Sequence, residues 1–312
     1  METWHTGVRA PRSQNGHPMF DRILVPLDGT PFAETAIPYA ELIPSRAVIL
    51  LHVFPPFGAQ HPAITRRAAV SMARCADRFA RQGREVERLL LRGEVRQTLI
   101  AEAARADLIV MATHGRGVAE RGRLGSTADW AARSGPRPTL LVRPDPAGRS
   151  AVAVARIVVP LDGSAFSETA LEIAEELAGD LGVPISLVRG VADSVDGPEV
   201  SSPETAADAV CLDGHVRRLH DRDVPASAHV LTGDIASSLI GELGPTDIVV
   251  IASRTPAGLE RWLPKSTSEA LVRLAHAPVL LVCPPPQPRA HTVVRAAAQP
   301  VAARAASAEL IP

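Results

Sequence analysis

Two glycines and a Ser-Thr pair in the first half of the chain have the types and spacing of a phosphate-binding loop. The segment runs from Ala112 through Gly115 to Gly125, which is followed by Ser126 and Thr127. Glycine lets the backbone approach a ligand closely. Amide groups at the start of a helix hold anions at the positive end of its dipole, and two hydroxyl groups would add donors. The pattern therefore predicts a site for a phosphate-bearing ligand.

A purely structural interpretation of this loop remains open. Ser126 would then cap the following helix, with Asp129 three residues later completing a cap that resembles a capping box. Asp28 bears on the choice because it ends a predicted strand and so lies at the same edge of the sheet as the loop. A carboxylate there can accept hydrogen bonds from a ribose. It can equally stabilise the turn at Gly29.

The elements that would position these residues alternate between strands and helices. In the first half we expect strands at 22–27, 47–54, 86–91, 107–112 and 138–142, and helices at 32–43, 61–82, 95–104 and from 125 onward. The apolar run AVILLHVF at 47–54 is typical of a strand covered on both faces. This order predicts an α/β fold with a parallel sheet between two layers of helices.

The second half of the chain repeats the first. The run ILVPLDGTPFAETA begins at Ile23, and IVVPLDGSAFSETA begins at Ile157. A spacing of this length corresponds to one domain per copy. The repeat predicts strands at 156–161, 184–189, 226–231, 247–252 and 278–282, and helices at 166–181, 204–221, 235–243 and 266–275.

The repeat divides the chain into two domains with segments outside them. We expect an arm at 1–19, a first domain at 20–144, a linker at 145–154, a second domain at 155–283 and a tail at 284–312. The arm and the Pro/Ala-rich tail lack a packing pattern, so both are expected to be disordered.

Composition excludes several classes of protein. With 312 residues, of which 46% are hydrophobic, the chain can bury two cores. The balance of 33 basic and 34 acidic residues, with 3% aromatics, argues against nucleic-acid binding. Residues 1–18 contain no apolar core, so we do not expect them to form a signal peptide, and no apolar run is long enough to span a membrane. We therefore expect a soluble, cytoplasmic protein.

Patterns for catalysis or for metal binding are not found in the sequence. Cys75, Cys211 and Cys283 are far apart and form no CxxC pair, so a disulfide framework or zinc knuckle is not expected. The ten histidines form neither an HxxxH nor an HExxH pattern. No pair of carboxylates indicates acid–base chemistry, and no Walker A motif occurs. We expect no catalytic residue and no metal site.

On these residues the chain resembles a tandem universal stress protein, over 20–143 and 155–283. The ATP-binding subgroup of that family carries the pattern G-x2-G-x9-G-[ST]. Here the pattern is Ala112-x2-Gly115-x9-Gly125-Ser126, with alanine in the first position. The resemblance implies two tandem five-stranded parallel-sheet domains, Rossmann-like and of the adenine nucleotide alpha hydrolase-like type. They would pack as an intramolecular pseudo-dimer through antiparallel pairing of their last strands.

The resemblance also implies which residues would bind ATP, with or without Mg²⁺. Pro26, Leu27 and Asp28 would line the ribose and adenine, and Val53 would meet adenine through its backbone. The phosphates would be wrapped by Met111, Ala112, Thr113, His114, Gly115, Arg116 and Gly117, and their far end would be held by Gly125, Ser126 and Thr127.

The departure at Ala112 puts a condition on this expectation. If that position needs a positive φ, alanine costs about 1 kcal/mol or more there. If the position is extended, the cost is small. The backbone conformation at Ala112 therefore decides how much the departure matters.

The second copy differs at the same loop. Thr255 and Lys265 replace both glycines that the first copy keeps, and Gly190 stands in the place of Val53. Either the second copy has lost nucleotide binding and serves as a structural partner, or Lys265 recruits a different anion as a point charge. The first interpretation is favoured because nothing else in that loop replaces the lost amide geometry.

These expectations lead to one favoured function and two alternatives. The favoured function is an ATP-binding regulator in stress response, with an unknown protein partner. A slow ATP hydrolase or phosphotransferase would have to use Asp28 or His114. A nucleotide-free scaffold would follow if Ala112 disables the site. The sequence leaves open whether whole chains form a homodimer.

Overall fold

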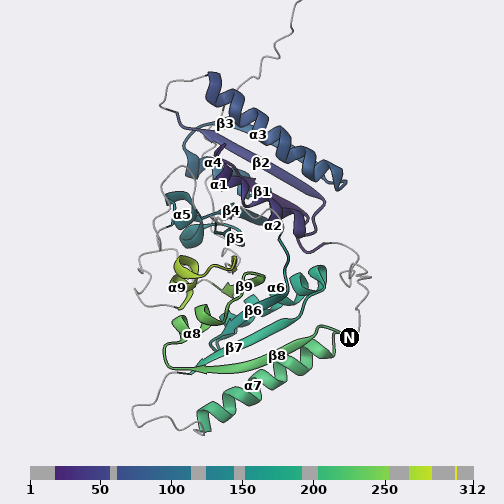
Figure 1. Cartoon of the computed structure of the whole chain (residues 1–312), viewed down its shortest axis with the longest axis vertical. Coiled ribbons are helices and arrows are strands. Elements are labelled where there is room, and N and C mark those ends of the chain that lie inside the picture. Colours follow the sequence, from purple (N-terminus) through teal and green to yellow (C-terminus); the bar gives the residue numbers. More distant parts are fainter. Residues whose placement is uncertain are drawn as a thin grey trace, which may run out of the picture.

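The computed structural model describes residues 18–56, 62–113, 124–143, 152–191, 203–252, 267–282 and 299–300. In these residues the two copies, domain 1 and domain 2, share one sheet of eleven strands with helices on both faces (Figure 1). The expected arm up to residue 17, most of the linker and nearly all of the tail lie outside the described residues. Figure 1 shows domain 1 at the top and domain 2 at the bottom.

Domain 1 is a parallel sheet with the strand order β3-β2-β1-β4-β5. Its strands are β1 (Arg22–Pro26), β2 (Ala47–Phe54), β3 (Glu85–Arg92), β4 (Leu108–Ala112) and β5 (Thr139–Val142). Its helices are α1 (Pro31–Glu34), α2 (Ile37–Leu42), α3 (Pro62–Arg81), α4 (Val95–Ala103) and α5 (Ser126–Ser134). The strand order reverses between β1 and β4, which is where sheets of this kind bind ligands.

Domain 2 repeats this arrangement with the strand order β10-β9-β6-β7-β8. Its strands are β6 (Arg156–Leu161), β7 (Ile185–Val191), β8 (Ala226–Thr232), β9 (Asp247–Ala252) and β10 (Val279–Val282). Its helices are α6 (Ala165–Leu181), α7 (Pro203–His220), α8 (Ile235–Glu242) and α9 (Thr267–Leu274).

The single helix expected at 32–43 is wrong, because the structure has the two helices α1 and α2 there. Pro38 is the second residue of α2, and it has no N–H to donate to the carbonyl group of Glu34. In the second copy Glu172 stands at the corresponding position, and α6 runs without a break. The proline therefore explains why the two copies differ at this point.

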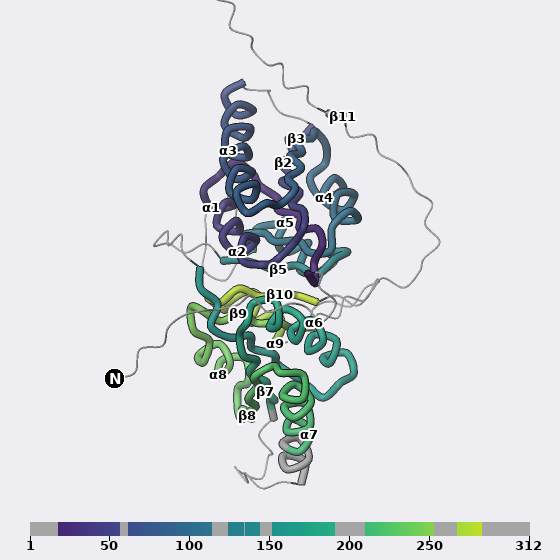
Figure 2. The backbone as a smooth tube through the Cα atoms, turned by 90° about the vertical axis from the view of Figure 1, so that its right-hand side faces the viewer, coloured from purple at the N-terminus to yellow at the C-terminus, as the bar shows by residue number. Residues whose placement is uncertain are grey.

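The two domains join through their last strands, as the resemblance implied. β5 and β10 pair antiparallel, with Leu140 opposite Leu280, and both side chains are fully buried. Figure 2 shows the two strands side by side at the middle of the molecule. Arg143 strengthens the junction by donating hydrogen bonds to the carbonyl groups of Arg273, in the last turn of α9, and of Ala275, just after that helix. The edges that would otherwise be exposed are thus paired within one chain.

Helices cover both faces of the shared sheet. One buried apolar cluster contains side chains of α1, α2 and α3 together with α6 and α7. The other contains side chains of α4, α5, α8 and α9. In Figure 2, α3 and α4 lie on opposite sides of β2 and β3. Side chains that alternate along β1 and β4 therefore enter different clusters, as expected for strands covered on both faces.

A short segment of the C-terminal region pairs with domain 1. β11 (Gln299–Pro300) runs antiparallel to β3, with Gln299 opposite Arg92 and Pro300 opposite Leu91. The expectation of a disordered tail is not tested elsewhere, since the rest of residues 283–312 lies outside the described part.

The two described cysteines differ in burial and should differ in reactivity. Cys75 on α3 is buried, and this burial, together with the carboxylate of Glu34, raises the pKa of its thiol to about 11. Cys211 on α7 is exposed. Because the thiolate is the reactive form, iodoacetamide at about pH 8 should alkylate Cys211 and leave Cys75 unreacted. Peptide mass spectrometry after a short reaction measures each thiol separately.

Alkylation in urea is the control for this experiment, because both thiols should react once the chain is unfolded. Rapid alkylation of Cys75 in the folded protein would contradict its buried position in the core beneath α3.

Two kinds of feature are missing from the described residues. None of the described helices is long and apolar enough to cross a membrane. Among the same residues, no group of three or more His, Cys, Asp or Glu side chains could hold a metal ion.

Candidate functional site

A cavity of about 420 Å³ lies at the carboxyl ends of β1 and β4, where the strand order reverses. Every predicted site residue that the structure describes lines this cavity: Pro26, Leu27, Asp28, Val53, Met111, Ala112, Thr113, Gly125, Ser126 and Thr127. The other predicted site residues, His114, Gly115, Arg116 and Gly117, lie outside the described residues. Residues from four separate parts of the chain thus meet at one place.

The cavity also has lining residues that the sequence reasoning missed, namely Ala33, Leu51, Pro55, Val95, Leu99 and Ala128. Leu51 was detectable, because it stands two residues before Val53 and so points to the same face of β2. Val95 and Leu99 are four residues apart on α4, which places both on one side of that helix. The signal for α4 was its helical spacing, but nothing in the sequence indicated which strand end it faces.

One side of the cavity is apolar. Leu51 and Val53 of β2 and Val95 and Leu99 of α4 supply branched aliphatic side chains there. Small-molecule sites combine such walls with a few well-placed polar groups. This side is therefore suited to a flat, apolar part of a ligand.

Asp28 follows β1 and is held by the turn that leads into α1. Its Oδ1 atom accepts hydrogen bonds from the Thr30 amide at 2.9 Å and the Thr30 hydroxyl at 2.6 Å. The Thr30 hydroxyl in turn accepts a hydrogen bond from the Ala33 amide and caps α1. Gly29, between them, has a φ of 79°, a conformation that favours glycine. Asp28 thus stabilises the turn and also lines the cavity.

The start of α5 carries no side-chain cap. Its N-cap residue is Gly125, with φ −60° and ψ 147°, and the amide of Gly125 donates to the Thr113 carbonyl group at 2.8 Å. The first hydrogen bond within the helix runs from the Asp129 amide to the Gly125 carbonyl group. The amides of Ser126, Thr127 and Ala128 precede this bond, so they have no acceptor within the helix. All three residues line the cavity.

The structural interpretation of Ser126 as the helix cap is therefore wrong. Ser126 is the first residue of α5, and the cap position belongs to Gly125. Asp129 does not complete a capping box either, because its carboxylate accepts hydrogen bonds from Arg133 at 3.1 Å. A glycine at the cap leaves the positive end of the helix dipole directed at whatever occupies the cavity.

Ala112 is extended. It is the last residue of β4 and pairs with Val142 of β5. Asp223 is the only residue other than glycine with a positive φ in the described part of the chain. The condition under which alanine would be costly at position 112 is therefore not met, and its methyl group adds only a small volume to the cavity wall.

Domain 2 is filled at the place that corresponds to the apolar side of the cavity. Gly190 of β7 takes the place of Val53, and Ile235, the first residue of α8, takes the place of Val95. A Cβ atom on Gly190 would lie only 2.6 Å from the Ile235 side chain, so that side chain packs directly on the β7 backbone. The loop with Thr255 and Lys265 lies outside the described residues.

Comparison with known proteins agrees with this architecture. The model of the Universal stress protein family matches residues 19–143 and again residues 154–283. The chain belongs to the universal stress protein family. The two matches coincide with the two halves of the sheet, so this universal stress protein is a tandem of two family domains.

Curated relatives come from mycobacteria. A universal stress protein of Mycobacterium tuberculosis strain H37Rv is 29% identical over 191 residues, and one of Mycobacterium bovis gives the same values. Each match covers 59% of this chain and 64% of the relative. The matched region therefore spans less than two thirds of the relatives' length.

Solved structures share the fold over most of the chain. A universal stress protein from Archaeoglobus fulgidus has a TM-score of 0.68 at 15% identity, covering 84% of this chain and 98% of its own. A structure described as a putative universal stress protein from Pseudomonas aeruginosa has a TM-score of 0.61 at 16% identity, covering 86% and 94%. Two universal stress proteins solved with cAMP and with dAMP have TM-scores of only 0.35 and 0.32, and at that level they say nothing about the ligand of this chain.

Proposed function

We propose that this universal stress protein binds ATP in domain 1 and acts as a nucleotide-dependent regulator in stress response. The observation that carries the proposal is a single cavity at the switch point of the sheet, bounded by Asp28, Val53 and the uncapped start of α5. Its volume lies within the range of about 300–1,000 Å³ that small-molecule sites occupy.

Each part of an adenine nucleotide has a suitable neighbour in this cavity. The apolar side formed by β2 and α4 would take the base, with the backbone of Val53 at its edge. Asp28 would accept hydrogen bonds from ribose hydroxyl groups. The amides of Ser126 and Thr127 would donate to the terminal phosphates, and the loop from His114 to Gly117 would wrap the others. Mg²⁺, if bound, would be held mainly through the phosphates, as is usual for this ion.

A regulator is favoured over an enzyme because of what surrounds the proposed phosphate position. Among the described residues that line the cavity, Asp28 is the only one with a titratable side chain. Its Oδ1 atom already accepts two hydrogen bonds from Thr30. A hydrolase or phosphotransferase would have to use Asp28 or His114 as its base. Loss of ATP turnover in Asp28→Asn or His114→Gln at unchanged ATP affinity would favour that alternative.

The first experiment is to denature the freshly purified protein and identify any released nucleotide by chromatography. We expect adenine nucleotide at close to one per chain. In domain 2 the Ile235 side chain packs on Gly190 and fills the space that corresponds to the apolar side of the cavity. Calorimetry with ATP and Mg²⁺ on the emptied protein measures the affinity directly. Two nucleotides per chain would contradict the difference between the domains. No released nucleotide together with no heat on adding ATP would support the nucleotide-free scaffold.

A further inference from the structure

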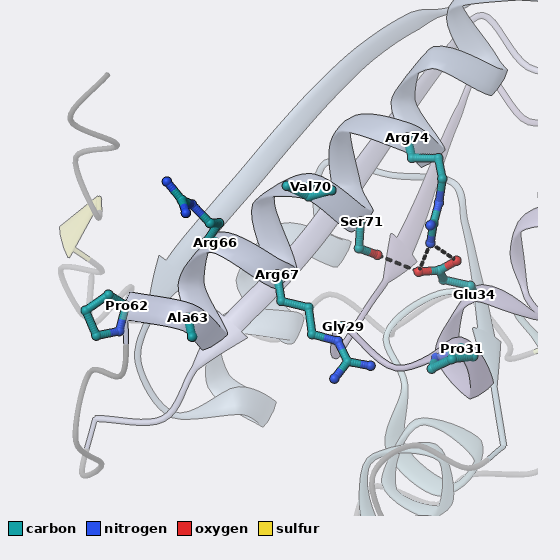
Figure 3. A pocket seen from close by; sticks show the side chains of 10 residues that line it. All are labelled: Gly29, Pro31, Glu34, Pro62, Ala63, Arg66, Arg67, Val70, Ser71 and Arg74. Carbon is teal, nitrogen blue, oxygen red and sulfur yellow. Dashed lines mark hydrogen bonds and ion pairs between the residues drawn. The ribbon is translucent and has the colours of Figure 1, made fainter. Parts of the chain in front are cut away.

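A second cavity, of about 790 Å³, lies across the turn that joins β1 to α1, beside the cavity in which we propose that nucleotide binds. It is bounded by Gly29 and Pro31 of the turn, by Glu34 of α1, and by the side of α3 between Pro62 and Arg74 (Figure 3). We propose that this α1–α3 groove docks a segment of a partner protein in which acidic residues flank an apolar side chain. The proposal does not depend on nucleotide binding.

The groove carries an excess of positive charge. Among the described residues that line it, Glu34 is the only acidic one, and its carboxylate is held by Arg74 at 2.7 Å and by the Ser71 hydroxyl at 2.6 Å. Arg66 and Arg67 are both exposed, and neither forms an ion pair within the described part of the chain. Figure 3 shows the Arg67 side chain extending toward Gly29, whereas Arg66 projects from another side of α3. Guanidinium groups pair readily with carboxylates in a bidentate manner.

Exposed apolar side chains accompany this charge. Val70 lines the groove about one turn after Arg66 and Arg67, and it is 61% exposed. Ile64 on α3 and Phe32 on α1 are 47% and 48% exposed, so the two helices that bound the groove carry three of the six exposed large apolar residues in the described chain. Scattered exposed apolar residues are ordinary, but Val70 lines the same groove as two arginines without an ion pair among the described residues, and such a combination is typical of a protein interface. A small inorganic anion would use the arginines and leave Val70 uncovered.

Domain 2 shows that the groove is not a necessary product of the fold. The corresponding pocket there is only about 30 Å³ and is lined by Gly163, Glu168, Arg189 and His215, among others. A Cβ atom on Gly163 would collide with the Arg189 guanidinium group, which fills this space. In domain 1 the corresponding strand residue is His52, which is buried beneath Gly29.

The charge pattern on the helix differs between the domains as well. α3 and α7 both begin with a proline, at Pro62 and Pro203. The two helices differ in length, so the positions are counted back from Phe79 and Leu219, whose carbonyl groups accept corresponding hydrogen bonds at the helix ends. On this count Ala206 and Ala207 stand where domain 1 has Arg66 and Arg67. Open space and uncompensated arginines thus occur together in domain 1 and are both missing at the counterpart in domain 2.

The test is a selection of random peptides displayed on phage against the full chain, followed by fluorescence anisotropy with the selected peptides. We expect peptides with acidic residues around an apolar one, and binding that weakens as salt is raised. Reversing both arginines, in Arg66→Glu/Arg67→Glu, should weaken binding by at least about tenfold, since like charges would then face each other. Val70→Ser should weaken binding without any change of charge.

The matched control is Arg88→Glu/Arg217→Glu, which changes the net charge equally. Both arginines are exposed, and neither lines a pocket or forms an ion pair in the residues that the structure describes. Thermal unfolding of all variants verifies that they are folded.

Equal binding by the Arg66→Glu/Arg67→Glu variant and by the unchanged protein would overturn the proposal, and so would a selection that yields no acidic peptides. The proposal would also be overturned if inorganic pyrophosphate bound through both arginines and displaced the peptide while Val70→Ser had no effect. The site would then be one for small anions.

Discussion

Replacing Gly125 with aspartate is expected to abolish ATP binding while making the folded protein slightly more stable. The φ of −60° and ψ of 147° at Gly125 suit any residue at a helix cap. An aspartate there would accept hydrogen bonds from the uncapped amides of α5 and place a negative charge at the positive end of the dipole. These contacts should raise the free energy of unfolding by about 0.5 kcal/mol.

The same change acts in the opposite direction on the ligand. The carboxylate of the variant would occupy the amides proposed for phosphate and would repel phosphate as well. Juxtaposed like charges cost several kcal/mol, so affinity for ATP should fall by more than about 100-fold. Calorimetry measures the affinity, and urea denaturation measures the stability. Few other changes at this site would move the two quantities in opposite directions.

Gly125→Asn is the matched control, because asparagine caps a helix about as well as aspartate but carries no charge. It should weaken ATP binding less than Gly125→Asp does. If the aspartate variant binds ATP as the unchanged protein does, the start of α5 does not hold the phosphates, and the proposed position of the nucleotide is wrong.

Truncation of the two leucines that face each other across the domain junction is expected to give the largest loss of stability. Leu140 and Leu280 are opposite one another in β5 and β10, and their exposed fractions are 1% and 0%. Leu280→Ala removes buried methyl groups and leaves a cavity, so the free energy of unfolding should fall by about 2–5 kcal/mol. Urea denaturation followed by circular dichroism measures this change.

The junction itself is tested by combining Leu280→Ala with Leu140→Ala. Residues in contact deviate from additivity by about 0.5–3 kcal/mol, whereas distant residues add within about 0.5 kcal/mol. Leu274→Ala on α9 is the control for a leucine outside the core, because Leu274 is 54% exposed and its loss should cost little. Strict additivity of Leu140→Ala and Leu280→Ala would contradict the packing of β5 against β10.

Much of the fold could be predicted from local patterns. The strand expected at 247–252 has those bounds in β9, and the helix expected at 61–82 is α3 at Pro62–Arg81. Apolar runs of this kind form covered strands in almost any parallel sheet, because both faces are buried there. The break between α1 and α2 was missed although Pro38 is visible in the sequence. The apolar spacing of that segment was weighed above the missing N–H group.

The candidate site could be predicted in part. Asp28 was recognised from the end of a strand, Gly125 from the glycine spacing and Val53 from the family resemblance, and the structure places all three around one cavity. Val95 and Leu99 were missed, because α4 reaches the cavity only through the crossover between β3 and β4. Ser126 was open to two interpretations, and the hydrogen bond from Asp129 to Gly125 excludes the one in which Ser126 caps the helix. Whether Ala112 is extended depended on its pairing with Val142.

Residue types and their order are enough to predict the repeat, the alternation of strands and helices, and which loop differs between the two copies. These features depend on residues that are close together in the sequence, so the sequence alone reveals them. The volume beside Asp28, the space between Gly29 and α3, and its closure by Arg189 in domain 2 appear only once the chain has folded. Each joins side chains that are far apart in sequence, and whether a gap between them stays open depends on how far each side chain reaches across it.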